Sequence, residues 1–262
     1  MTCFYRGLKL FQDVVKNMRV YVGFDDTDNA KADRGTGKLA RWFEGALPGG
    51  CRLWGVVRQQ LLVDPRIPYT SHNSSACAIV DCEDPLPLKL LIERAVSHIE
   101  RHSLPGSDPG LCVATESDRC LSDLTCFGLE CAKKVLTQGD ALKAVDGAHL
   151  SGHGGTNDGI IGAAAGVGLT AWGWSGRFIE YGRGGLRSLP KTVSVGELED
   201  AGIGVISLDR DAHIVPRDDL VDTGGWLRPR LLGGKAVLPV MARGEHLWES
   251  PGRKRSKEHM EG

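Results

Sequence analysis

The sequence has no long apolar run, no closely spaced cysteine pair and almost no net charge. A transmembrane helix needs about 20 consecutive apolar residues, and no stretch of this chain approaches that length. We therefore expect no membrane span and a soluble, cytoplasmic protein. The 32 Lys and Arg residues against 33 Asp and Glu residues leave a net charge of −1. This balance excludes a positive field over the whole molecule, so any surface for nucleic acid must be local.

Cysteine is present, but not in the spacing of a metal site. The chain contains no CxxC pair, and the irregular spacing of residues 120, 126 and 131 is poor geometry for a closed zinc site. A chain of this size does not need disulfide staples, and no signal peptide precedes the cysteines. We therefore expect reduced thiols at all eight positions. They are Cys3, Cys51, Cys77, Cys82, Cys112, Cys120, Cys126 and Cys131.

Glycine is the residue that the chain has in excess, at 35 of 262 positions, roughly twice the usual share of about 7%. Seven of these glycines lie between Gly152 and Gly168, interleaved with aliphatic residues. A glycine-rich loop that leads into a helix lets a ligand approach the backbone closely. Tight packing of the helix on a sheet explains the glycines inside the helix equally well. Only the loop at residues 153–159 is therefore a candidate site.

Hydrophobic periodicity predicts an α/β fold, with an α+β arrangement as the alternative. We expect a mixed sheet flanked by helices and a small β-rich C-terminal unit. Strands are expected at residues 19–24, 53–63, 76–80, 203–208 and 236–241, and helices at residues 38–43, 87–102, 118–136 and 140–145. The expected domains are an N-terminal extension at 1–17, which is a short amphipathic helix or the result of a misassigned start, a core at 18–189, the β-rich unit at 190–248, and a disordered basic tail at 249–262.

An acidic turn closes the first predicted strand. Asp25, Asp26 and Asp28 lie within four residues of each other, and their mutual repulsion costs stability unless a cation or a donor-rich ligand neutralises it. Mg²⁺ takes one or two carboxylates together with phosphate oxygens and water. The pattern therefore indicates a site for a metal and a nucleotide. The alternative is a solvated acidic turn in which Asp28 or Asn29 caps the next element.

The segment Gly35-Thr36-Gly37-Lys38 comes next, at the start of a predicted helix. It is not a Walker A motif, because that motif requires glycine and Ser or Thr where this chain has Ala32 and Leu39. Backbone N–H groups at a glycine-rich helix start can still bind phosphate. Thr36 is either a hydroxyl at that phosphate site or a plain N-cap.

A polar cluster separates the two strands predicted at 53–63 and 76–80. Its side chains can donate hydrogen bonds to a phosphate or to a substrate carbonyl, and the alternative is an ordinary solvated loop. We assign substrate binding to Arg66, Tyr69, His72, Asn73 and Ser74.

Four of these blocks, in this order, resemble the catalytic core of the archaeal 2-agmatinylcytidine synthetases, ATP-dependent enzymes that modify the anticodon of an isoleucine tRNA. The G-[IF]-D-D-T-D loop of that family is similar to residues 23–28, and its I-P-Y-K-T-R-G-N-G-A segment to residues 67–76. Its Pro-Gly segment is similar to Asp108-Pro109-Gly110, and its G-x-G-L-I-G-A-L-A-A-V-G stretch to residues 158–168. The resemblance covers about residues 18–181.

The resemblance implies that residues 18–189 form an ATP-binding, kinase-like core. Asp25, Asp26 and Asp28 would hold Mg²⁺ and the phosphates of ATP, and Thr36 matches a threonine that is autophosphorylated in that family. The family phosphorylates a cytosine carbonyl oxygen, and agmatine then displaces the phosphate. The nucleotide-binding residues would be Thr27, Gly35, Gly37, Lys38, Gly154, Gly155, Thr156, Asn157, Asp158 and Gly159.

Two departures from the family point to a different substrate. The family continues into an OB-fold and a zinc ribbon that hold the tRNA, whereas this chain ends at Gly262 without a CxxC pair. It also has Thr70-Ser71-His72 where the family has Lys-Thr-Arg, so positive charge is lost beside the expected substrate.

We therefore expect a Mg²⁺-dependent, ATP-using phosphotransferase or ligase-like enzyme that phosphorylates a carbonyl or hydroxyl oxygen of a small-molecule or RNA substrate. The first alternative is a tRNA-modifying catalytic subunit that works with a separate RNA-binding partner. The second is a nucleotide-binding regulatory module without catalysis. An unrelated α/β protein would bind no ATP.

Overall fold

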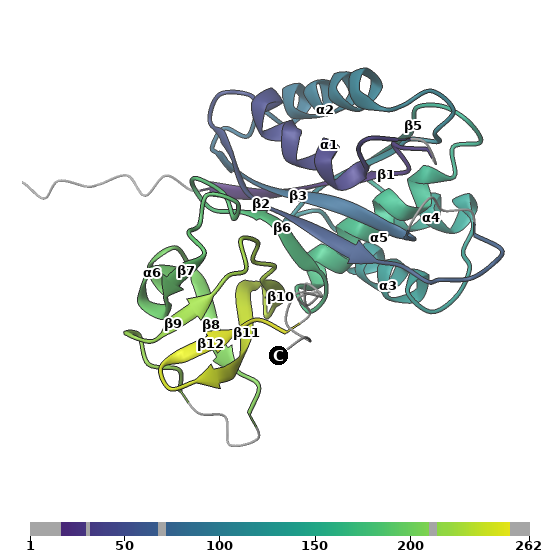
Figure 1. The fold of residues 1–262 in the computed structure, drawn as a ribbon. Coiled ribbons are helices and arrows are strands. Elements are labelled where there is room, and N and C mark those ends of the chain that lie inside the picture. Colours follow the sequence, from purple (N-terminus) through teal and green to yellow (C-terminus); the bar gives the residue numbers. More distant parts are fainter. Residues whose placement is uncertain (1–16, 30–31, 68–71, 210–213, 252–262) are drawn as a thin grey trace, which may run out of the picture.

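The computed structural model describes residues 17–29, 32–67, 72–209 and 214–251. The expected N-terminal extension up to residue 16, the predicted substrate residue Tyr69 and the tail from residue 252 lie outside these ranges. Within them the molecule consists of a helix-covered sheet and a β-rich C-terminal unit (Figure 1).

The core sheet is built around β1, whose neighbours β3 and β4 both run antiparallel to it. In their order across the sheet, the core strands are β5 (His149–Gly152), β4 (Gly110–Thr115), β1 (Asn17–Asp25), β3 (Ser74–Glu83), β2 (Cys51–Gln60) and β6 (Arg177–Tyr181). Side chains alternate between the faces of a strand, and Val20, Val22 and Phe24 of β1 are fully buried on one face. The predicted strand at residues 19–24 is thus part of β1, at the centre of this sheet.

Helices cover both faces of the core sheet (Figure 1). One face carries α1 (Thr36–Trp42), the short 3₁₀ helix η1 (Phe43–Ala46) and α2 (Leu88–His102). Their buried side chains, such as Leu39, Phe43 and Leu91, share a cluster with Val22 and Phe24. The opposite face carries α3 (Leu121–Cys131), α4 (Gln138–Ala144) and α5 (Gly159–Trp172). The predicted α/β class and its mixed sheet with flanking helices are confirmed.

Helix α5 lies unusually close to the sheet because glycines face each other across the contact. A Cβ atom on Gly23 of β1 would collide with the backbone oxygen of Ala163, and one on Gly168 would collide with the backbone of Leu124 in α3. These contacts support the structural explanation for the glycines within the helix. They also bring the first turn of α5 against the end of β1.

The C-terminal unit continues the sheet from β6. Its elements are β7 (Thr192–Ser194), α6 (Val195–Asp200), β8 (Ile203–Ser207), β9 (Leu220–Asp222), β10 (Arg230–Leu232), β11 (Lys235–Gly244) and β12 (Leu247–Glu249). Strand β10 pairs with β6, and β11 pairs in parallel with β8. Leu198, Leu238 and Val240 are buried in one cluster with Val57 and Phe178 of the core sheet. One continuous core therefore joins this unit to the helix-covered sheet.

Three core strands were not predicted from the sequence, namely β4, β5 and β6. Every residue of β4 is buried, because the strand lies between β1 and β5 with helices on both faces. Such a strand shows no alternation of polar and apolar residues.

None of the described helices is long and apolar enough to cross a membrane.

The expectation that all cysteines are reduced is wrong for one pair. Cys51 of β2 and Cys82 of β3 lie directly opposite each other and form a disulfide. Their Cα atoms are 4.1 Å apart, which only the sheet register brings about across 31 residues of sequence. Among the described cysteines, the free thiols are those of Cys77, Cys112, Cys120, Cys126 and Cys131.

Candidate active site

The acidic turn begins where β1 ends, against the start of α5. Asp25 is the last residue of β1 and lies opposite Gly110 of β4. Since Phe24 faces α1 and α2, the alternation of the strand turns Asp25 toward α5. A Cβ atom on Gly162 would collide with the Asp25 carboxylate. Gly162 is therefore the position that makes room for this side chain.

Burial and like charge raise the pKa of two of the carboxyl groups. Burial, followed by the charges of Asp26 and Asp28, raises the pKa of Asp25 to about 7. Burial and the neighbouring charges of Asp108, Asp28 and Asp158 raise the pKa of Asp26 to about 6. Asp26 also has a left-handed φ of 46°, a conformation that side chains other than glycine adopt at a cost. Negative charge is thus concentrated here, and a cation would relieve the repulsion.

Thr36 is fixed beside this turn as the first residue of α1. Its buried hydroxyl oxygen accepts hydrogen bonds from the Thr27 backbone N–H at 3.3 Å and from the Thr27 hydroxyl at 3.1 Å. Gly35, not Thr36, occupies the N-cap position, so the plain N-cap interpretation of Thr36 is wrong. The hydroxyl hydrogen of Thr36 is not used by these two bonds, because both of them donate to its oxygen.

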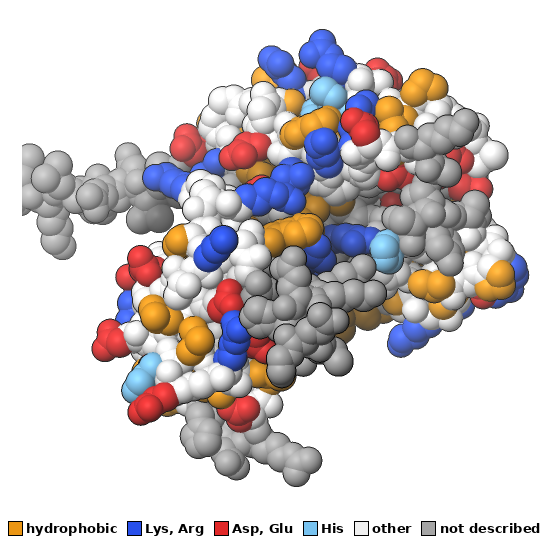
Figure 2. Space-filling view, in the orientation of Figure 1, with side chains coloured by type: hydrophobic (Ala, Val, Ile, Leu, Met, Phe, Trp, Pro, Cys, Tyr) orange, Lys and Arg blue, Asp and Glu red, His pale blue; other side chains and the backbone are white. Residues whose placement is uncertain are grey.

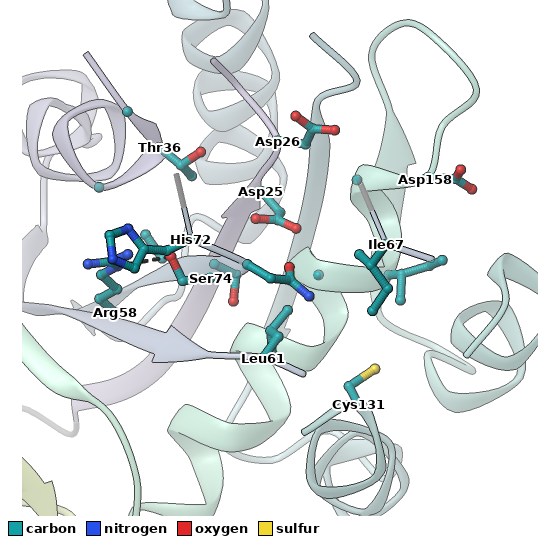
Figure 3. Close-up of a pocket in the computed structure, with 18 of the residues that line it drawn as sticks. Asp25, Asp26, Thr36, Arg58, Leu61, Ile67, His72, Ser74, Cys131 and Asp158 are labelled. Carbon is teal, nitrogen blue, oxygen red and sulfur yellow. Dashed lines mark hydrogen bonds between the residues drawn. The ribbon is translucent and has the colours of Figure 1, made fainter. Parts of the chain in front are cut away.

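One cavity of about 790 Å³ brings most of the predicted residues together. Figure 3 shows Asp25 in its centre, with Thr36 above it, His72 and Ser74 to one side and Asp158 to the other. The volume lies within the range of about 300–1,000 Å³ that is usual for ligand sites. The predicted residues that line it are Asp25, Asp26, Asp28, Gly35, Thr36, Gly37, Lys38, Arg66, His72, Asn73, Ser74, Asp158 and Gly159.

The glycine-rich loop before α5 has a different partner from the one predicted. The carboxylate of Asp108 accepts hydrogen bonds from the backbone N–H groups of Thr156 at 3.0 Å, Asn157 at 2.7 Å and Asp158 at 3.1 Å. Gly154, Gly155, Thr156 and Asn157 are not among the residues that line the cavity. An internal carboxylate therefore takes the place that the sequence analysis gave to a phosphate. Thr27, which is buried, supports Thr36 and does not line the cavity either.

The predicted substrate residues are held by the ends of β2 and β3. The Asn73 side chain donates to the backbone oxygen of Leu62 at 2.6 Å, and Ser74 accepts a hydrogen bond from Arg58 at 2.9 Å. Arg66 makes a bidentate ion pair with Asp64 at 2.8 and 2.9 Å, so its guanidinium already has an anionic partner. His72 is exposed at the cavity wall. Their role in substrate binding stays a prediction.

Several residues of the cavity wall were missed. They come from helices, strands and loops that are distant in sequence, and only Ser75 lies within a motif recognised from the sequence, at residues 67–76. The most informative additions are Arg41, Arg58, Ser75, Cys131, Arg187 and Trp226. Ser75 is fully buried, and its hydroxyl has no hydrogen-bond partner among the described residues. The position of Ser75 next to the predicted polar cluster could have indicated it, whereas Arg187 and Trp226 belong to the C-terminal part of the chain.

The acidic turn is chemically suited to Mg²⁺ with a nucleotide rather than to a closed metal centre. Within the described residues, no three His, Cys, Asp or Glu side chains are grouped closely enough to hold a metal by themselves. Mg²⁺ needs no such group, because it takes most of its ligands from phosphate and water. Asp25, Asp26 and Asp28 supply oxygen donors at the cavity wall. The donor set therefore fits a metal bound together with phosphate.

Comparison with known proteins gives no family model and no curated relative that matches the chain. Part of the chain is similar to TiaS. TiaS in complex with tRNA and ATP is 26% identical with a TM-score of 0.49, over 58% of this chain and 36% of that chain. Apo TiaS, a tRNA agmatidine synthetase, is 25% identical with a TM-score of 0.48, over 58% and 35%. A tRNA fluorescent labeling enzyme is 28% identical with a TM-score of 0.49, over 58% and 36%.

The matched part thus spans little more than a third of the TiaS chain. The resemblance noted from the sequence motifs, to a tRNA agmatidine synthetase, is also the one found by this comparison.

Proposed function

We propose that this protein binds ATP with Mg²⁺ and transfers a phosphoryl group to an oxygen atom of an acceptor. The observation that carries the proposal is the meeting of the acidic turn, Thr36 and the start of α5 in one cavity of about 790 Å³. That volume accommodates a nucleotide with space for a second molecule. The motif resemblance to the agmatinylcytidine synthetases supports the same chemistry, and the substrate of this chain is a separate question.

Each part of the cavity has a role in this proposal. Asp25, Asp26 and Asp28 would hold Mg²⁺, which neutralises phosphate charge when bound. Lys38 and Arg41 line the same wall and would bind phosphate oxygens. The Thr36 hydroxyl would donate to the transferring phosphoryl group or accept it. Catalysis then consists of positioning and of electrostatic stabilisation, as in other phosphoryl transfers.

The chemical step forms one bond and breaks one. The acceptor oxygen bonds to the γ-phosphorus while the bond from that phosphorus to the β,γ-bridging oxygen breaks, and ADP leaves. A hydroxyl acceptor gives up its proton, and a carboxylate of the acidic turn would take it. A carbonyl acceptor releases no proton. Formation of AMP and pyrophosphate would mean attack at the α-phosphorus instead.

The first experiment measures ATP consumption by the purified full chain with Mg²⁺, resolving the nucleotide products. Asp25→Asn should lower turnover by at least about 100-fold, because it removes a metal-binding charge at the centre of the cavity. Asp33→Asn is the matched control, because Asp33 is exposed on the same connection and does not line the cavity. Equal turnover in Asp25→Asn and the wild type would refute the proposal. ATP binding without consumption would favour the regulatory module.

A tRNA-modifying enzyme that works with an RNA-binding partner is the second candidate. The specific observation in its favour is that four motifs occur in the same order as in a tRNA-modifying family. The assay is therefore run with bulk tRNA added and withheld. Turnover that requires tRNA would select this candidate over a small-molecule kinase.

A further inference from the structure

The sheet register places arginines side by side on three neighbouring strands. Arg58 of β2 lies directly opposite Arg177 of β6, and Arg177 lies directly opposite Arg230 of β10. Directly opposed residues point to the same face, and like charges in such pairs are destabilising. Three arginines in one cross-strand row are therefore an energetic cost that ordinary sheet packing does not explain.

Two more arginines join this row from loops of the chain after β6. The guanidinium carbon of Arg228 lies 3.7 Å from the centre of the Trp226 ring, and that of Arg187 lies 5.1 Å from it. Arg58, Arg187 and Trp226 line the cavity of the candidate active site. Trp226 is 44% exposed, so part of its ring is open to a bound molecule at the cavity wall. In Figure 2, Lys and Arg side chains gather in the middle of this face.

The arginines repel each other, and no carboxylate among the described residues compensates their charge. Burial and then the charge of Arg177 lower the pKa of Arg58. Burial and the charges of Arg177, Arg58 and Arg187 lower the pKa of Arg228. Across the described part of the chain, no carboxylate lies within ion-pairing distance of Arg58, Arg177, Arg187 or Arg228. Arg41, by contrast, pairs with Glu180 at 3.7 Å.

We propose that Arg58, Arg177, Arg187 and Arg228, together with Trp226, form an anion subsite that binds a phosphate group carried by the acceptor molecule. This inference rests on the proposed phosphoryl transfer and names the class of its acceptor. Guanidinium groups bind phosphate in a bidentate geometry, and a bound anion would remove the repulsion within the row. Trp226 adds a flat surface for an aromatic group beside that phosphate.

The location of the subsite indicates that it binds a phosphate of the acceptor and not a phosphate of ATP. The carboxylates that would hold the metal and the ATP phosphates lie at the end of β1, whereas the subsite lies beyond Arg58, across β2, β6 and β10. Figure 3 shows Arg58 and Asp158 on opposite sides of Asp25. Arg187 and Trp226 also follow residue 181, where the motif resemblance ends. The C-terminal part of the chain therefore contributes Arg187, Trp226 and Arg228 to the subsite, whereas Arg58 and Arg177 come from the core sheet.

The experiment titrates the full chain with anions while the ATP site is saturated with Mg²⁺ and a non-hydrolysable ATP analogue. The probes are inorganic pyrophosphate and bulk tRNA, in separate arms. We expect binding that weakens with salt, and a loss of at least about tenfold in affinity in the double variant Arg187→Gln/Arg228→Gln. Arg183→Gln is the matched control, because Arg183 is exposed on the same loop as Arg187 and does not line the cavity.

The outcomes separate this proposal from the proposed function. Unchanged anion binding in the double variant overturns the subsite. Weaker binding of the ATP analogue, with anion binding unchanged, also overturns it and assigns the arginines to ATP. The same titration without the analogue reports on the subsite even where ATP itself does not bind. Loss in the tRNA arm alone identifies an RNA phosphate as the source, and loss in both arms identifies a phosphate group in general.

A second measurement does not depend on an acceptor. In the absence of anions, Arg228→Gln should raise the midpoint of thermal unfolding, because it relieves repulsion from Arg177, Arg58 and Arg187. Arg183→Gln should leave the midpoint unchanged. A lower midpoint in Arg228→Gln would show that the arginine acts as packing for Trp226 and not as an uncompensated charge, and it would overturn the subsite.

Discussion

The cavity has an acidic wall and a basic wall, and the two arise in different ways. The acidic wall is a local feature of sequence, because Asp25, Asp26 and Asp28 are neighbours along the chain. The basic wall is assembled from Arg58, Arg187 and their partners on separate strands and loops. A cluster of carboxylates can thus be recognised in a short motif, whereas a cluster of arginines can depend on strand register and on the packing of distant loops. The predictions below test whether the two walls have the separate roles that this comparison assigns to them.

After Asp25→Asn, the largest expected effect is at Thr36 on the acidic wall. Thr36→Val should lower kcat for ATP turnover by at least about tenfold, because it removes the hydroxyl that would contact the transferring group in the proposed reaction. It also leaves the buried donors of Thr27 unpaired, which costs about 1–3 kcal/mol of unfolding free energy. Thr36→Ser keeps the hydroxyl and should retain most of both.

Turnover and intact mass measured on the three proteins separate the roles of Thr36. A phosphate adduct present in the wild type and in Thr36→Ser, but absent in Thr36→Val, would make Thr36 a phosphoacceptor. Full turnover in Thr36→Val would show that the Thr36 hydroxyl takes no part in catalysis. It would also weaken the assignment of phosphoryl transfer to the acidic wall.

A smaller effect is expected where α5 meets the acidic wall. Gly162→Ala places a methyl group against the Asp25 carboxylate, and overpacking of this kind costs about 1–3 kcal/mol. Chemical denaturation should show this loss, together with weaker Mg²⁺–ATP binding. Gly45→Ala is the control, because nothing lies within 4 Å of a Cβ atom at that position. Equal stability of the two variants would mean that Asp25 does not depend on α5.

The smallest expected effect is the pH dependence of stability that comes from two histidines, His98 in the core and His246 in the C-terminal unit. Burial lowers the pKa of His98, whose Nε2 lies 2.9 Å from the backbone oxygen of Leu39. Its contribution to stability is therefore complete above the unfolded value of about 6.5 and is lost as the pH falls through the lowered pKa of the folded state. His246 in the C-terminal unit has the opposite sign, because its hydrogen bond to Asp219 at 2.7 Å raises its pKa. Its contribution is complete below about 6.5 and is lost as the pH rises through the raised pKa.

NMR titration of the two imidazole rings in the full chain checks this contrast directly. We expect His98 to titrate below and His246 above the value of an unstructured peptide. The reverse order would contradict the burial of His98 or the contact of His246 with Asp219. No variant is needed, so the measurement cannot be confused with misfolding.

The sequence predicted those parts of the fold whose signal is local. Helix α2 has a clear apolar stripe and was placed to within one residue, at 87–102 against Leu88–His102. Strand β4 was not predicted because a strand buried on both faces loses its alternation. The sequence indicated that the backbone N–H groups of the glycine-rich loop bind an anion. Only the folded chain shows that this anion is the carboxylate of Asp108. A carboxylate 48 residues away in sequence leaves no local trace.

By itself, the sequence determined the fold class, the acidic turn at the end of β1 and the glycines that α5 needs. Each of these depends on residues that are neighbours along the chain or at a fixed helical or strand period. The tertiary structure alone decided the disulfide between Cys51 and Cys82, the partner of the loop before α5 and the row of arginines across β2, β6 and β10. These depend on strand register and on packing between distant segments, and a shift of one residue in register would turn each side chain to the other face.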